Sequence, residues 1–216
     1  MYPRSLRPHH HEGETLMPGL PPPVADERQN LTEFLAFNQN AFFAVAYGLT
    51  DEQARSTPSV SALSIGGLIK HATGVQRSWA QRIVCAPEFP PPDPRPVEEQ
   101  MQEYQDEHVM REHETLEELL DALRAQNAET LRALREADLD TPVPVPHDVP
   151  WFPKDVDHWS VRWVALHLTE ELTRHAGHAD IIRESIDGAT MYELMAAYEE
   201  WPETDFLRRW RPTQPA

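Results

Sequence analysis

The chain has 216 residues, of which 40% are hydrophobic, so it is long enough for one domain with a substantial core. Its 36 acidic residues against 19 basic ones give a formal net charge of -17, and no cluster of Lys and Arg offsets it. This charge excludes binding to the phosphate backbone of nucleic acids. The sequence contains no apolar run of about 18 residues, which excludes a transmembrane helix. We therefore expect neither a nucleic-acid nor a membrane partner.

The only cysteine, Cys85, cannot form an internal disulfide and is typical of a reducing compartment. The first residues contain prolines and the run His9–His11, and they lack the apolar segment of a signal peptide. We therefore expect a cytoplasmic protein in which residues 1–24 form a flexible N-terminal arm. Cys85 is expected to be a small core residue at the end of a helix.

Apolar residues at helical spacing predict four long helices, separated by prolines and glycines. The first predicted helix runs from Asp26 to about Tyr47, and a turn with a short helical stretch follows over 48–58. The second helix runs from Ser64 to about Val84, and the third lies in a charged region over 97–137. The fourth runs from Ser160 to about Asp187 and closes at Gly188. Pro-rich stretches over 87–96 and 138–158 connect them, and the tail can add one short helix. The predicted fold is an all-α four-helix bundle over residues 25–202, followed by a C-terminal tail over 203–216.

The fourth predicted helix carries metal-binding side chains on its apolar face. With Glu171 at 0° and about 100° per residue, His175 falls at about +40°, His178 at about -20° and His167 at about -40°. Apolar side chains occupy the same arc: Val164, Leu168, Ile182 and Ile186. A buried carboxylate without a partner costs several kcal/mol, so Glu171 needs a cation or strong donors. Because Glu171 and His175 are four residues apart, both can reach one ion, and the arc favours this pair. His178 stays an alternative ligand if Glu171 turns outward.

Two ligands on one helix need a third from elsewhere in the bundle. His71 lies on the flank of the apolar stripe of the second predicted helix, from which it can point into the bundle. The preceding Gly66 and Gly67 would permit close approach of another helix. In the charged region, His108 and His113 are expected on the surface.

Other side chains near the ligands on the last long helix have simpler expected roles. Asp180 and Arg183 are expected to form a surface or cap pair. The tryptophans that can wall a pocket, or simply pack in the core, are Trp79, Trp151 and Trp163.

Two segments of the chain resemble the signature segments of the DinB/YfiT-like superfamily. They read LSIGGLIKHATGVQRSW, from Leu63, and VRWVALHLTEELTRHAGHADIIRESIDG, from Val161, and the resemblance extends over most of residues 26–202. It implies a four-helix bundle in which one histidine of the second helix and two ligands four apart on the last long helix hold a metal. Carried over to this chain, these ligands are His71, Glu171 and His175. A glutamate in the second position resembles the branch with mycothiol-dependent maleylpyruvate isomerase, whose metal is zinc.

The resemblance also implies a chemistry. Two histidines and a carboxylate leave a coordination position open, which is typical of a catalytic metal site. The enzymes that this chain resembles use a low-molecular-weight thiol such as mycothiol, which the metal stabilises as the attacking thiolate. We therefore expect a metal-dependent enzyme that transfers the thiol to a small electrophile or isomerises it, with zinc as the first choice of metal and nickel, iron or manganese as alternatives. His167 and His178 are the candidate catalytic residues, as carriers of a proton.

The sequence leaves two other functions open. The chain can be a non-enzymatic metal-binding or stress-associated protein, or a hydrolase in which a metal-bound water attacks with His167 as the base. The maleylpyruvate isomerase has a further C-terminal domain that this sequence lacks, so a single-domain thiol S-transferase is expected rather than an isomerase. A homodimer, formed through an exposed face of the bundle, is a further expectation.

Overall fold

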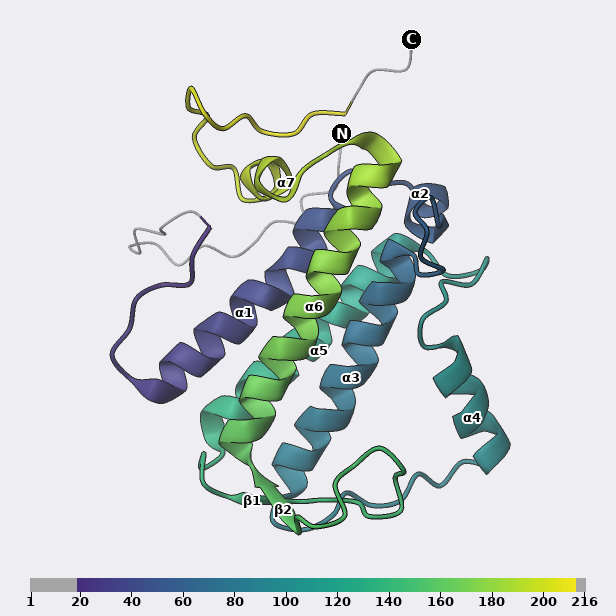
Figure 1. Cartoon of the computed structure of the whole chain (residues 1–216), viewed down its shortest axis with the longest axis vertical. Coiled ribbons are helices and arrows are strands. Elements are labelled where there is room, and N and C mark those ends of the chain that lie inside the picture. The colour runs from purple at the N-terminus through teal and green to yellow at the C-terminus, as the bar shows by residue number, and fades with distance from the viewer. Residues whose placement is uncertain (1–18, 213–216) are drawn as a thin grey trace.

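The structure is a computed structural model, and it describes residues 19–212 (Figure 1). Most of the arm predicted over residues 1–24, including the run His9–His11, and the last four residues of the predicted tail lie outside the described residues. The helices are α1 (Glu27–Ala46), α2 (Asp51–Arg55), α3 (Ile65–Cys85), α4 (Val97–Asp106), α5 (Leu116–Glu136), α6 (Val161–Asp187) and α7 (Met191–Tyr198). Two short strands, β1 (Pro142–Pro144) and β2 (His158–Ser160), complete the described elements.

The long helices begin where the sequence predicts capping residues. Asp26, Ser64 and Ser160 are the N-caps of α1, α3 and α6, and each side chain accepts a hydrogen bond from a backbone N–H in the first turn. At the other end of α6, Gly188 has a φ of 77°, a left-handed conformation that glycine adopts without strain. Cys85 is the last residue of α3 and is half-buried.

The four long helices α1, α3, α5 and α6 form one bundle, which confirms the predicted all-α fold (Figure 1). α3 packs against α5 and α6, and α1 packs against the same two helices from the opposite side. Fully buried apolar side chains from all four helices fill the centre, among them Leu35, Leu68, Ile69, Leu123, Leu168 and Leu172. Burial of such side chains stabilises the bundle by roughly 1.5–3 kcal/mol each.

Within the charged region, two helices take the place of one. α4 ends at Asp106 and has no buried residue, and it stands apart from the bundle in Figure 1. α5 begins after Thr115, whose side chain forms a capping box with Glu118. The connection between α4 and α5 runs against the first turn of α3, where the carbonyl oxygen of His108 faces Gly67.

The Pro-rich connection between α5 and α6 contains a small antiparallel ribbon that the sequence does not predict. β1 pairs with β2 with Val143 opposite Trp159, and both of these side chains are buried. Pro142 and Pro144 flank Val143 and have no N–H to donate, so only a short pairing forms. The ribbon holds the intervening loop against one end of the bundle.

Arg183 corrects one expectation from the sequence. It is fully buried, and its guanidinium donates hydrogen bonds to the carbonyl oxygens of Val45 and Tyr47, at 2.6 and 2.9 Å, and to the carboxylate of Asp187. It therefore joins the end of α6 to the end of α1 and does not form a surface pair with Asp180. None of the helices in the described part of the chain has the length and apolar character to cross a bilayer.

Candidate metal centre

The structure brings His71, Glu171 and His175 together at the interface of α3 and α6. One donor atom from each residue lies within 4.8 Å of those of the other two. His175 Nε2 lies 3.1 Å from Glu171 Oε2, and the rings of His71 and His175 are 4.6 Å apart and nearly perpendicular, at 77°. A tetrahedral ion about 2.1 Å from each donor would hold the donors roughly 3.4 Å apart. Shifts of about 1 Å in the side chains would therefore suffice to close the three donors around one cation.

The electrostatics of the three side chains fit a cation. The side chain of His71 is only 12% exposed, and its Nδ1 faces the carboxylate of Glu107 at 3.0 Å, which leaves Nε2 as the donor for an ion. The pKa of Glu171 lies below its usual value, first because it hydrogen-bonds to His175 and also because His167 and His71 are nearby, although burial opposes the shift. Glu171 is therefore a carboxylate at neutral pH, which is the form that binds metal. Two nitrogen donors and one carboxylate suit zinc and other divalent transition metals.

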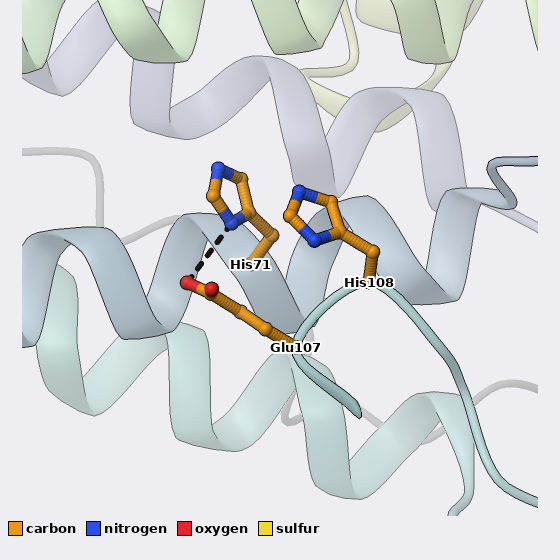
Figure 2. Close-up of side chains that lie close together, drawn as sticks. All are labelled: His71, Glu107 and His108. Atoms are coloured by element: carbon orange, nitrogen blue, oxygen red, sulfur yellow. Dashed lines mark ion pairs between the residues drawn. The ribbon is translucent and has the colours of Figure 1, made fainter. Parts of the chain in front are cut away.

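A second group of potential ligands adjoins the first, and it shares His71. Glu107 and His108 come from the connection between α4 and α5, and their donor atoms lie within 4.8 Å of His71 and of each other (Figure 2). Glu107 Oε1 is 3.0 Å from His71 Nδ1, although the contact lacks the geometry of a hydrogen bond. The ring of His108 stacks on that of His71 at 4.0 Å. The prediction that His108 lies on the surface is therefore wrong, whereas His113 is exposed as expected.

Two glycines explain how this connection reaches the site. A Cβ on Gly67 would lie 2.0 Å from the carbonyl oxygen of His108, and one on Gly66 would lie 2.3 Å from the sulfur of Met110. The close approach that these glycines were expected to permit is thus made by the α4–α5 connection and not by a helix. Met110 is buried there, which fixes the connection over the first turn of α3.

Ring orientation favours the first group of ligands over the second. The lone pair of an imidazole nitrogen lies in the plane of its ring, so the planes of two ligating histidines must converge on the ion. His71 and His175 meet at 77°, which allows this, whereas His71 and His108 are stacked at 24°. The pKa of His108 is lowered, chiefly by burial and then by His71, so its ring is neutral at pH 7. Glu107 and His108 accordingly cover the site beside His71.

The two predicted catalytic histidines occupy different surroundings on α6. His167 Nε2 lies 4.0 Å from Glu171 Oε1, one turn before that residue, and the His167 ring stacks on Trp163. His178 is half-buried, and within the described chain it belongs to neither of the two groups of potential ligands. The structure therefore places only His167 next to the proposed ligands.

Beyond His167 lies a cavity with aromatic walls. Its volume is about 820 Å³, and Trp79, Trp151 and Trp163 all line it, together with Phe152, Trp159 and His167. Trp79 is buried and contacts four of these rings, so it also packs in the core. Trp79 therefore packs in the core and also lines the cavity, so the two roles considered for these tryptophans do not exclude each other.

The fold is an all-α bundle, and its candidate metal centre consists of two histidines and a glutamate between two neighbouring long helices. A family model described as mycothiol-S-transferase matches residues 30–188, and the chain belongs to this family of thiol S-transferases. A crystal structure of a conserved protein from Enterococcus faecalis has the same fold, with a TM-score of 0.51 and 16% sequence identity over 77% of this chain and 100% of that one. A search among curated proteins found no match.

Proposed function

We propose that this protein is a divalent-metal-dependent S-transferase that joins mycothiol, or a closely similar thiol, to a small electrophile. In this proposal His71, Glu171 and His175 hold the metal, with zinc as the first choice and nickel, iron or manganese as alternatives. Membership of the mycothiol-S-transferase family supports the thiol and the reaction class. The observation that supports the metal is the convergence of three donors from two helices, one of which, Glu171, has a lowered pKa and is a carboxylate at neutral pH.

When bound there, a divalent cation would act as a Lewis acid that favours the deprotonated form of a thiol. The residues of the chain have the remaining tasks. Glu171 carries the negative charge that attracts the cation, and the two histidines set its position from the neighbouring helices α3 and α6. In this proposal His167, whose Nε2 lies 4.0 Å from Glu171 Oε1, accepts the proton of the thiol and passes it to solvent. His178, three residues after His175 on the same helix, remains a predicted second proton carrier.

The test is to purify the chain without an affinity tag and to measure bound metal by mass spectrometry and turnover with and without mycothiol. We expect about one metal ion per chain and turnover only when the thiol is present. His71→Ala, Glu171→Gln and His175→Ala should each lose both the metal and the turnover. His167→Ala should keep the metal but lower the turnover number by about 100-fold, the usual contribution of a proton-transfer group.

The matched control is His113→Ala, which changes an exposed histidine outside the site and should retain both metal and turnover. Metal binding that survives all three ligand substitutions would overturn the ligand assignment. Turnover without any thiol would favour the metal-assisted hydrolase, and a metal-loaded chain that leaves every electrophile unchanged would favour a non-enzymatic role.

We also propose that residues 25–202 form the metal-binding domain, that residues 203–216 are a tail, and that the protein acts in the cytoplasm. A homodimer is part of the proposal, and the exposed Leu166 and Ile181 on α6 support it. Light scattering after size exclusion would measure the mass, and Ile181→Lys should convert a dimer into a monomer. A monomeric mass for the unmodified chain would overturn the dimer.

A further inference from the structure

A continuous row of side chains on α6 connects the candidate metal centre to the aromatic cavity. Trp163, His167, Glu171 and His175 follow one another at intervals of four residues and therefore lie on one face of the helix. Trp163 and His167 stack with ring centres 5.0 Å apart, His167 lies 4.0 Å from Glu171, and Glu171 lies 3.1 Å from His175. One helical turn is about 5.4 Å, so a molecule in the cavity would lie about one turn from Glu171.

The cavity is apolar and partly open to solvent. Trp151 is 69% exposed and Trp163 is 39% exposed, although both have large hydrophobic side chains. Aromatic rings that remain exposed beside a functional site are typical of a surface that a ligand covers. A volume of about 820 Å³ is sufficient for a molecule with one or two rings.

Two of the polar residues at the rim of the cavity are already engaged in the structure, and His158 and His167 also line it. Asp140 pairs with Arg162, and Ser160 caps α6 by accepting a hydrogen bond from the N–H of Trp163. Apolar side chains therefore make up most of the wall, and the two histidines are the main polar side chains left for a ligand. It suits a flat apolar ring better than the sugar and inositol of mycothiol.

A separate groove on the other side of α3 has the opposite character. Its volume is about 510 Å³, it lies between α3 and α4, and Glu107 connects it to the candidate metal centre. Polar and charged side chains line it, including Lys70, Arg77, Gln81, Arg95, Gln100 and Glu103. Several of these side chains pair with one another, as Arg95 does with Asp93 and Glu103, but all of them can hydrogen-bond to hydroxyl groups. The carrier part of the thiol therefore has a more suitable place in this polar groove than in the aromatic cavity.

We infer that the aromatic cavity walled by Trp151 and Trp163 binds the acceptor, and that the acceptor is a flat aromatic electrophile with a leaving group. This inference rests on the proposed function, because it assigns the second substrate of the same reaction. With an arylmethyl halide, the thiol sulfur forms a bond to the benzylic carbon while the carbon–halogen bond breaks. The halide leaves with the bonding electron pair, and the thiol proton passes to His167 and then to solvent.

The binding test uses 4-nitrobenzyl alcohol, which has the ring of such an acceptor but no leaving group, and needs neither thiol nor turnover. Titration calorimetry should show binding to the full chain. Trp163→Ala and Trp151→Ala should each weaken it by about three- to tenfold, as expected for the loss of one aromatic contact. The matched control is Phe206→Ala, which removes a fully exposed ring outside the cavity and should leave binding unchanged. Because Trp151 is mostly exposed, its variant keeps the test valid if Trp163→Ala fails to fold.

The kinetic test compares 4-nitrobenzyl chloride with chloroacetamide at saturating mycothiol, each corrected for its uncatalysed rate. The unmodified chain should prefer the aromatic chloride in kcat/KM, and the preference should fall about tenfold in the Trp variants, mainly through a higher KM. Binding that is absent from the unmodified chain, or equal in the Trp variants and the Phe206 control, overturns the inference even if thiol turnover is found. A preference that is unchanged in both Trp variants overturns it as well. Loss of binding in the variants without any thiol turnover supports the aromatic site while the proposed transferase function fails.

Discussion

Helix α6 carries charged groups in its packed faces at two places, one fully buried and one half-buried, and the two places differ in how those groups are neutralised. Near its end, Arg183 is fully buried, and its guanidinium is paired with two carbonyl oxygens at the end of α1 and with Asp187. Two to three turns earlier, the half-buried Glu171 and His175 converge with His71 of α3. The first cluster is neutralised by groups of the protein, whereas the second brings together three donors that suit a cation.

This difference separates a structural role from a functional one. Three electron-pair donors that face one another repel unless a proton or a cation lies between them, so the group of His71, Glu171 and His175 fits a bound ion. Another fully paired case lies in the core, where Gln76 accepts a hydrogen bond from Gln39 and donates one to Asn127. We therefore interpret the Arg183 network and this amide chain as stabilising elements, and the His71 group as a binding site.

The largest effect is expected from removing the satisfied charge. Arg183→Met should lower the free energy of unfolding by about 3–5 kcal/mol, because two carbonyl oxygens and the carboxylate of Asp187 would lose their partner. Chemical denaturation measures this loss, and metal affinity should not change in protein that remains folded. Arg174→Met on the same helix is the control, since Arg174 is 79% exposed and should change stability by less than about 1 kcal/mol. Equal effects of the two substitutions would contradict the clamp role of Arg183.

The next effect concerns the incomplete site, which a metal should complete. Zinc at 100 times its dissociation constant should raise the free energy of unfolding by about 2.7 kcal/mol, because only the folded chain brings the three donors together. Thermal denaturation with and without a chelator measures the difference. Glu171→Gln should abolish it, whereas His178→Ala should leave it intact. The reverse result would make His178 the ligand and would mean that Glu171 does not bind the metal.

The comparison also shows what the sequence could predict. The helices and their caps follow from local patterns, such as the apolar spacing in α6 and the N-caps Ser64 and Ser160. The pairing of Glu171 with His175 likewise needs only the geometry of one helix. These features are predictable because every atom involved lies within a few turns of chain.

Arg183 and His71 contact residues that are far away in the chain, and the sequence did not reveal these contacts. Arg183 is bound by the carbonyl oxygens of Val45 and Tyr47, which are more than 130 residues away in the chain. Glu107 reaches His71 only because α4 ends at Asp106 and the connection crosses Gly67. One signal was present: Thr115 and Glu118 have capping-box spacing, which predicts a helix start at 116 and places His108 in a connection rather than on a helix surface.

A smaller effect should test the role of Glu107 beside the site. Glu107→Gln should weaken metal affinity about tenfold, or about 1.4 kcal/mol, because a carboxylate next to His71 Nδ1 favours the tautomer with its proton on that nitrogen and leaves Nε2 free for the ion. Competition with a chromogenic chelator measures the affinity. Glu103→Gln, an exposed position on α4, is the matched control. His108→Ala should change the metal affinity less than threefold. If His108→Ala instead loses as much affinity as His71→Ala, the metal ligands would be His71, Glu107 and His108.

The smallest effect comes from Asp180, a half-buried carboxylate on α6 between the two places compared above. Burial, with a contribution from Glu184, raises its pKa to about 6, whereas an unfolded chain has a value near 3.9. Because the folded-state pKa is the higher one, the relative stability from this group is fully present below pH ~4 and is lost as the pH rises through ~6. Asp180→Asn removes this loss. It should therefore stabilise the chain at pH 8 by on the order of 1 kcal/mol, discounted for solvent screening of a group that is partly exposed, and by much less at pH 4.5.

The measurement is the free energy of unfolding of both chains at the two pH values, with chelator present so that pH-dependent metal binding does not contribute. Asp121→Asn is the control, because Asp121 is 62% exposed and should give nearly the same small difference at both pH values. A gain at pH 8 that is no larger than at pH 4.5 would mean that Asp180 is well solvated in the folded chain. In that case the two buried charge clusters of α6 would be separated by a stretch of helix that water reaches, and removing one cluster should leave the stability contribution of the other unchanged.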